Sequence, residues 1–142
     1  MSSTRPSQLR LLVADDDASC REALGEFFRR EGFQVCFAST GLEALARLRV
    51  ERMDLSVLDV HMPGLTGPEV LQLLMQEVPA PPVPPSILVS SDDSAADLIE
   101  SLLGPRQFGF VSKPISLAAL RRTLHQLLSD SDPQGPRGPL AP

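Results

Sequence analysis

The chain has 142 residues, 42% of them hydrophobic and 22% charged, which is typical of one globular domain with a sizeable core. Its 13 Lys and Arg residues against 18 Asp and Glu residues give a net charge of −5, so the chain has no general electrostatic attraction to nucleic acid or to anionic membranes. We therefore expect neither direct nucleic-acid binding nor membrane binding.

Five short apolar runs along the chain have the length of β-strands. Three of them are continuous rather than alternating, which is typical of strands covered on both faces. The predicted strands are Leu9–Ala14, Gln34–Ala38, Leu55–Leu58, Ile87–Val89 and Gly109–Val111.

Between these runs, apolar residues recur at helical spacing and predict one helix after each strand. Capping-box patterns begin at Ser19 and Thr40, Pro68 fits the first turn of the third helix, and Ser116 is placed to cap the last helix. The apolar stripes are Leu24, Phe27 and Phe28; Leu42, Leu45 and Leu48; Val70, Leu71 and Leu74; Leu98, Leu102 and Leu103; and Leu117, Leu120, Leu124 and Leu127.

The alternation of strands and helices predicts an α/β fold, a doubly wound parallel sheet with helices on both faces. We expect the domain to cover residues 9–128, after an N-terminal extension at residues 1–8 and before a disordered, Pro/Gly-rich tail or linker at residues 129–142. The five prolines between Pro79 and Pro85 predict a stiff, exposed connector. A docking motif for a proline-recognising module is the less favoured alternative.

The cysteine content and the apolar runs point to a reducing cytoplasm. Two cysteines, Cys20 and Cys36, are too few for a disulfide framework and lie among apolar neighbours, as small buried hydrophobes do. No apolar run approaches the roughly 20 residues that span a bilayer. The start of the chain lacks the apolar core of a secretory signal.

Polar side chains follow four of the five predicted strands. In a doubly wound sheet, ligands bind beyond the carboxyl ends of the strands. Helix capping and turn formation explain some of these residues, but they explain Asp59 and Lys113 poorly, because no helix begins directly after Asp59 and a cation is disfavoured at a helix N-terminus. The four strand ends carry Asp15-Asp16-Asp17, Asp59, Ser90-Ser91 and Ser112-Lys113-Pro114.

These residues together favour phosphoryl transfer onto an aspartate. Two carboxylates about 5 Å apart repel by roughly 3 kcal/mol at an effective dielectric of 20, so the cluster calls for a cation. An oxygen-only ligand set favours Mg²⁺, which keeps positions open for phosphate oxygens. One carboxylate can then act as a nucleophile toward phosphorus while a lysine neutralises charge on the transferring group.

Four segments, LRLLVADDD, LSVLDVHMPGLTG, SILVSS and FVSKP, resemble in order and spacing the receiver domain of two-component response regulators. The resemblance covers about Leu9 to Leu128 and implies a flavodoxin-like strand order of 2-1-3-4-5. It implies that Asp59 is the phospho-acceptor. It also implies that Mg²⁺ is held by Asp15, Asp16, Asp59 and the main-chain carbonyl of His61.

The resemblance assigns further roles around the acceptor. It implies that Ser90 is the switch hydroxyl, that Lys113 pairs with the phosphate, and that the bond between Lys113 and Pro114 is a cis peptide. Phe110 matches the switch aromatic, and ordinary core packing is an equal alternative for it. His61 and Asp92 fall at positions that tune the phosphoryl lifetime in the family.

The implied function is a cytoplasmic signalling switch, a phosphoprotein of a phosphorelay, that catalyses only its own phosphorylation and dephosphorylation. A histidine kinase or phosphotransfer protein would donate the phosphoryl group. The surface of the fourth helix, fifth strand and fifth helix would then signal to a downstream protein target or a fused output domain. A phosphorylation-dependent homodimer is left open.

Two alternatives belong to other classes. Asp15-x-Asp17-x-Ser19 resembles the opening motif of haloacid-dehalogenase-like phosphatases, in which Asp15 would be the nucleophile and Asp17 the acid/base. The lack of a later acidic pair and of room for a cap domain argues against this enzyme. The second alternative is a phosphate-independent interaction module on the same fold, against which the complete set of polar residues weighs.

Overall fold

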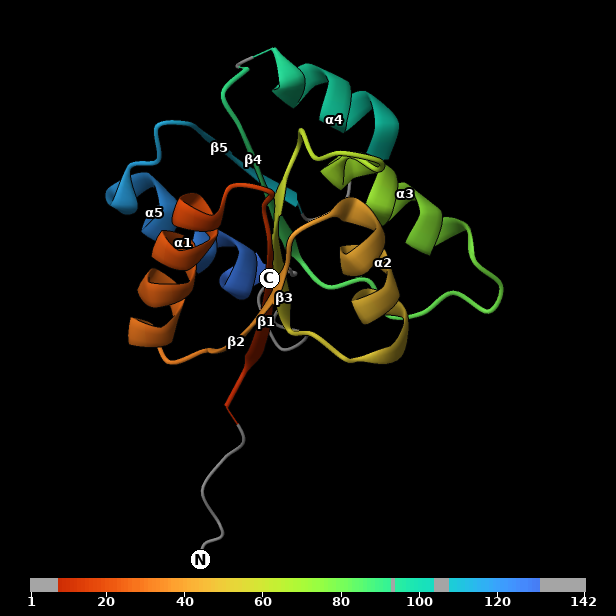
Figure 1. Cartoon of the computed structure of the whole chain (residues 1–142), viewed down its shortest axis with the longest axis horizontal. Helices are drawn as coiled ribbons and strands as arrows, with labels where there is room; N and C mark the ends of the chain where they lie inside the picture. The colour runs from red at the N-terminus through yellow and green to blue at the C-terminus, as the bar shows by residue number, and fades with distance from the viewer. Residues whose placement is uncertain (1–7, 93, 104–107, 131–142) are drawn as a thin grey trace, which may run out of the picture.

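The computed structural model describes residues 8–92, 94–103 and 108–130. Within them, five parallel strands form one sheet in the order β2-β1-β3-β4-β5, which confirms the predicted fold class and strand order (Figure 1). Each strand end lies within one residue of its predicted position. The strands are β1 (Arg10–Ala14), β2 (Gln34–Ala38), β3 (Leu55–Asp59), β4 (Ser86–Ser90) and β5 (Phe108–Ser112).

The helices form two layers around the sheet. Helices α1 and α5 cover one face, and α2, α3 and α4 cover the other (Figure 1). Because helices cover both faces, every residue of β3 and β4 is buried, and neither strand shows the strict alternation of apolar and polar residues that is typical of a half-exposed strand. The helices are α1 (Ala18–Arg30), α2 (Gly41–Val50), α3 (Gly67–Gln76), α4 (Ala95–Leu103) and α5 (Leu117–Asp130).

The start of α1 differs from the prediction. Asp17, not Ser19, is the N-cap, since its carboxylate accepts hydrogen bonds from the backbone N–H groups of Ser19 (2.9 Å) and Cys20 (3.4 Å). The predicted capping box beginning at Ser19 is therefore wrong. An aspartate directly before the first turn satisfies the free N–H groups, which leaves Ser19 inside the helix.

The other helix starts follow the sequence more closely. The Thr40 hydroxyl accepts from the N–H of Glu43 at the start of α2, although the Glu43 carboxylate accepts from the N–H of Ser39 rather than from that of Thr40. Pro68 lies in the first turn of α3, as predicted. Ser116 caps α5 by accepting from the N–H of Ala119 at 3.2 Å, also as predicted.

Among the stripe leucines whose side chains the structure describes, which leaves out Leu98, three face solvent instead of the core. Leu42 is 63% exposed, Leu102 is 40% exposed and Leu117 is 57% exposed. Leu42 and Leu117 lie in the first turns of α2 and α5, where the helices have only begun to pack on the sheet. The stripes are thus buried from their second leucine onward in these two helices.

The proline-rich connector lies between α3 and β4 without helix or strand. It is exposed where it begins, at Pro79, and buried at Pro84, whose carbonyl accepts a hydrogen bond from the Ser86 hydroxyl at 3.0 Å. The prediction of an exposed connector therefore holds only for its first part. The predicted tail begins two residues too early, because α5 continues through Ser129 and Asp130. The predicted N-terminal extension, apart from Gln8, and the rest of the predicted tail lie outside the described residues.

Candidate functional site

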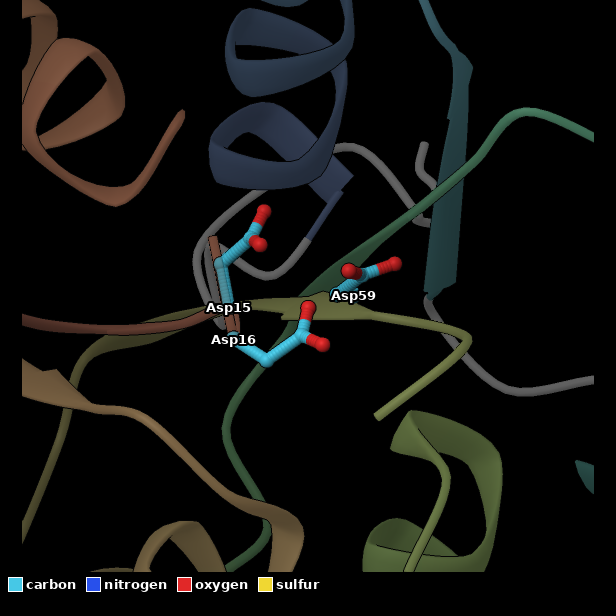
Figure 2. Close-up of side chains that lie close together, drawn as sticks. All are labelled: Asp15, Asp16 and Asp59. Carbon is cyan, nitrogen blue, oxygen red and sulfur yellow. The ribbon is translucent and has the colours of Figure 1, made fainter. Parts of the chain in front are cut away.

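The carboxyl ends of β1 and β3 bring three aspartates together. Because these strands are paired in parallel, with Ala14 opposite Leu58, the residues that follow at the same edge are Asp15 and Asp59. Carboxylate oxygens of Asp15, Asp16 and Asp59 all lie within 4.8 Å of one another. Figure 2 shows the three carboxylates close together, with the side chain of Asp16 extending toward Asp59.

Burial distinguishes the members of this cluster. Asp15 is 1% exposed and Asp59 is 5% exposed, whereas Asp16 is open to solvent. The buried carboxylates have backbone donors: Asp15 Oδ1 accepts from the N–H of Asp17 (2.9 Å), and Asp59 Oδ1 accepts from the N–H of His61 (3.2 Å). One oxygen of each buried carboxylate is thus fixed by the chain two residues further on.

Lys113 supplies a cation at the same edge of the sheet. Its Nζ donates to Asp59 Oδ2 at 3.3 Å and to Asp15 Oδ2 at 3.5 Å. One ammonium group therefore faces two buried carboxylates, and the cluster keeps an excess of negative charge.

The excess of negative charge affects the pKa values of both Asp59 and Lys113. Burial, and then the neighbouring charge of Asp15, raise the pKa of Asp59, and the Lys113 ammonium only partly opposes them. Burial by itself lowers the pKa of Lys113, but the charges of Asp59 and Asp15 outweigh it and raise that pKa. The site thus holds Lys113 charged and would gain from a second cation.

The donor set fits a hard divalent cation. The ligand atoms that converge are all carboxylate oxygens, two from buried residues and one from an exposed residue. Mg²⁺ prefers one or two carboxylates with water and phosphate oxygens in its other positions. An exposed rim at Asp16 leaves access for those oxygens.

Ser90 ends β4 at the same edge and is fully buried. Its Oγ accepts from the N–H of Asp92 at 3.0 Å, and its carbonyl accepts from the N–H of Lys113 at 2.8 Å. The Lys113–Pro114 peptide bond is cis, which is the conformation that the resemblance implies. Phe110 in β5 is half-buried and packs against the core beneath α2, α3 and α4.

His61 and Asp92 lie exposed beside the acceptor. The main-chain N–H of His61 binds Asp59, while its side chain faces solvent. The hydroxyl of Ser94, and then its N–H, lower the pKa of Asp92, and the nearby His61 side chain contributes in the same direction. The two side chains therefore lie on one rim of the site.

Two neighbours of the cluster were not predicted as site residues. Arg21 in α1 donates through Nη1 to the Asp15 carbonyl at 2.6 Å. Cys20 is half-buried rather than buried, as is Cys36, and at Cys20 burial, and then the neighbouring Asp15 carboxylate, raise the pKa of the thiol to about 12. The sequence signal for Arg21 and Cys20 is their position in the first turn of the helix that follows Asp17, because this turn lies over the end of β1.

The strand order and the acidic cluster at the carboxyl edge define a flavodoxin-like α/β domain with a candidate metal site. Residues 11–125 match the family described as the response regulator receiver domain, and the chain belongs to this family. The membership confirms the resemblance and favours the receiver interpretation over the hydrolase alternative.

Similar proteins agree with this family. The chain is 34% identical over 118 residues to the probable transcriptional regulatory protein TcrX of Mycobacterium tuberculosis, covering 83% of this chain and 49% of that protein. It is similar in structure to CheY4 of Vibrio cholerae (TM-score 0.73, 25% identity, 85% of this chain and 99% of that chain). The receiver domain of the Francisella response regulator 1452 is also similar (TM-score 0.72, 29% identity, 87% and 99%).

The chain spans about half the length of curated relatives such as TcrX and the response regulator MprA of Mycobacterium sp. strain KMS. Across the described part of the chain, no helix combines the length and the apolar character needed to cross a membrane.

Proposed function

We propose that this receiver domain is a phosphorylation-dependent switch that accepts a phosphoryl group on Asp59. The convergence of Asp15, Asp16 and Asp59, with Lys113 Nζ 3.3 Å from Asp59, is the observation that carries the proposal. The donor is a histidine kinase or a phosphotransfer protein, in keeping with the two-component family to which the chain belongs.

Asp15, Asp16 and Asp59, with the main-chain carbonyl of His61, are the residues that would hold Mg²⁺. When bound, the ion neutralises charge on the oxygens of the transferring phosphoryl group. An Asp59 oxygen attacks phosphorus, the bond from phosphorus to the donor nitrogen breaks, and its electron pair stays on that nitrogen. Lys113 pairs with a phosphoryl oxygen through the ammonium that the aspartates already hold at this edge.

Ser90 and Phe110 are the proposed switch residues. The Ser90 hydroxyl lies at the carboxyl edge, where it can turn to donate to a phosphoryl oxygen, and this movement gives up its bond to the N–H of Asp92. Phe110 follows by turning into the space that the hydroxyl leaves. The α4-β5-α5 surface then signals, which requires two states only a few kcal/mol apart.

The same proposal extends to partners and boundaries. The switch works in the cytoplasm, occupies residues 9–130 so that all of α5 is included, and acts on a downstream protein or through a fused output domain rather than by binding nucleic acid or a membrane itself. It catalyses only its own phosphorylation and dephosphorylation. A homodimer formed on phosphorylation is compatible with signalling through α4, β5 and α5.

The test is phosphorylation by small donors. The chain is incubated with Mg²⁺ and either acetyl phosphate or phosphoramidate, and intact mass is followed with time. We expect a gain of one phosphoryl group that disappears in Asp59→Ala and persists in Asp97→Ala, an exposed aspartate of α4. A gain that persists unchanged in Asp59→Ala would overturn the assignment.

A further inference from the structure

A cavity of about 250 Å³ opens between the start of α1 and the segment that joins β5 to α5. Its lining is mainly apolar. Leu24 is buried at its base, Ile115 is half-buried, and the exposed residues Ala23 and Leu117 stand at its rim. An apolar cavity of roughly 150 Å³ is large enough to hold benzene, so this one has room for a short hydrocarbon chain.

The cavity lies beside the proposed phosphoryl-accepting site, with which it shares Lys113. Lys113 contributes to the lining while its Nζ lies 3.3 Å from Asp59 Oδ2. Because its ammonium is held by the aspartates, Lys113 offers its methylene stem to the cavity. Cys20, which also lines the cavity, lies near enough to Asp15 for that carboxylate to help raise the pKa of its thiol. The cavity therefore begins at the side chain whose ammonium faces Asp59, so a donor paired with Lys113 has apolar surface beside it.

We propose that this cavity binds the hydrocarbon chain of a small acyl phosphate, such as propionyl or butyryl phosphate, during phosphoryl transfer to Asp59. This inference rests on the proposed function. The charges around the cavity favour this class of ligand. An anionic head is attracted to Lys113 and to a bound cation, whereas the adjoining apolar lining is favourable only for an apolar tail. An acyl phosphate joins such a head and tail in one small molecule.

The transfer is balanced without any further reactant. An Asp59 carboxylate oxygen forms a bond to phosphorus, and the bond between phosphorus and the acyl oxygen breaks. The electron pair of that bond leaves with the oxygen, so the products are the aspartyl phosphate and the free carboxylate anion. The hydrocarbon chain takes no part in the bond changes and acts only through its burial.

The test compares donors that differ only in chain length. Second-order rate constants are measured at fixed Mg²⁺ for acetyl, propionyl and butyryl phosphate, with phosphoramidate as the donor that has no chain. Intact mass is the readout because the chain has no Trp and no Tyr. We expect the rate constant to rise by about threefold to fourfold for each added methylene, which is the effect of burying one methylene group.

A matched pair of variants locates the effect. Ala23→Phe fills the cavity from an exposed position of α1, and we expect it to reduce the ratio of butyryl to acetyl rate constants to about one. Its phosphoramidate rate constant should stay within about twofold of the unsubstituted chain. Ala46→Phe places the same side chain on an exposed position of α2, on the other face of the sheet, and should keep the full ratio.

Every outcome of these measurements either supports or overturns the inference. Equal rate constants for the three acyl phosphates, or an unchanged ratio in Ala23→Phe, overturn the inference while labelling by phosphoramidate still supports the proposed function. An Ala23→Phe variant that slows phosphoramidate as much as butyryl phosphate also overturns it. If Ala23→Phe blocks only transfer from a phosphotransfer protein, the cavity belongs to a protein contact instead. Absence of labelling by every donor defeats the proposed function itself.

Discussion

Lys113 Nζ lies 3.3 Å from Asp59 Oδ2, although Asp59 ends β3 and Lys113 follows β5, and β4 lies between these strands in the sheet. The lysine reaches across the end of β4, where its own N–H is bound to the Ser90 carbonyl at 2.8 Å. The backbone of Lys113 is thus tied to one strand and its side chain to the next. A shift in any of these three strand ends changes the distance between the acceptor and its cation.

The raised pKa of Asp59 predicts how metal-free stability depends on pH. A carboxyl group whose pKa in the folded state lies above its usual value of 3.8 binds protons more tightly in the native state, so its contribution to stability falls as pH rises from 3.8 through the folded pKa. Asp59→Asn removes this loss, worth about 1.4 kcal/mol for every tenfold change in proton affinity. In EDTA at pH 7 the variant should therefore be more stable than the unsubstituted chain.

Urea unfolding of both proteins between pH 3.5 and 7.5 measures this difference in the free energy of unfolding. The pH range begins at about the usual pKa of aspartate and extends upward from it. The stabilisation by Asp59→Asn should grow with pH and then level off. A variant that is less stable than the unsubstituted chain at neutral pH would show that the Lys113 ion pair outweighs the burial of Asp59 and its repulsion by Asp15.

Mg²⁺ should stabilise the folded chain through the acidic cluster. A ligand that binds only the native state at 100 times its Kd adds about 2.7 kcal/mol to the free energy of unfolding. Asp16→Ala removes an exposed ligand and should abolish most of the Mg²⁺-dependent rise in Tm while leaving the metal-free Tm nearly unchanged. Thermal unfolding with and without Mg²⁺ checks this, with Asp97→Ala as the control. An equal Mg²⁺ effect in Asp16→Ala would remove this residue from the ligand set.

The parts of the fold that were predictable are those with a strong local signal. β3 and β4 are buried on both faces, and the apolar residues at their centres make both strands visible in the sequence. The polar residues at the ends of these strands could be predicted to lie close together, because parallel strands end at one edge of the sheet.

Other features depend on tertiary contacts, which the spacing of apolar residues in the sequence does not reveal. Both Asp17 and Ser19 are good N-caps, and the choice between them is made by where β1 ends, at Ala14. The capping box formed by Thr66 and Glu69 at the start of α3 was overlooked beside the proline signal of Pro68. The cavity beside Lys113 arises from the angle between two segments distant in sequence, and no local pattern predicts it.

Gly67 provides a test of how the backbone at the acceptor is supported. A Cβ atom at Gly67 would lie 2.7 Å from the Asp59 carbonyl oxygen and 3.2 Å from the Leu58 Cβ, so the first turn of α3 packs directly against the end of β3. Gly67→Ala should cost about 1–3 kcal/mol in the free energy of unfolding and should slow phosphorylation, because it displaces Asp59.

Gly41→Ala is the matched control, since its Cβ would clash with the Leu65 backbone rather than with the acceptor. It should lower stability without a comparable loss in phosphorylation rate when both variants are assayed well below their Tm. Equal loss of phosphorylation in the two variants would mean that the rate follows general stability and not the position of Asp59.

A buried serine pair between β3 and β4 predicts an unequal pair of mutational effects. Ser86 Oγ donates to the Pro84 carbonyl at 3.0 Å, so the contact of 2.5 Å between the Ser56 and Ser86 hydroxyls has Ser56 as its donor. Ser86→Ala leaves both the Ser56 hydroxyl and the Pro84 carbonyl without that partner, whereas Ser56→Ala leaves the bond to Pro84 in place. We expect Ser86→Ala to cost about 1–3 kcal/mol and Ser56→Ala to cost less.

The double variant separates this network from simple loss of packing. Once Ser86 is replaced, removing the unpaired Ser56 hydroxyl should cost almost nothing further. In urea unfolding, the double variant should therefore lose less stability than the sum of the losses in the two single variants. Both serines are buried at the start of their strands, away from the carboxyl edge, and phosphorylation rates should be unchanged. A larger cost for Ser56→Ala than for Ser86→Ala would reverse the direction of the hydrogen bond and with it the anchoring of the proline-rich connector to β4.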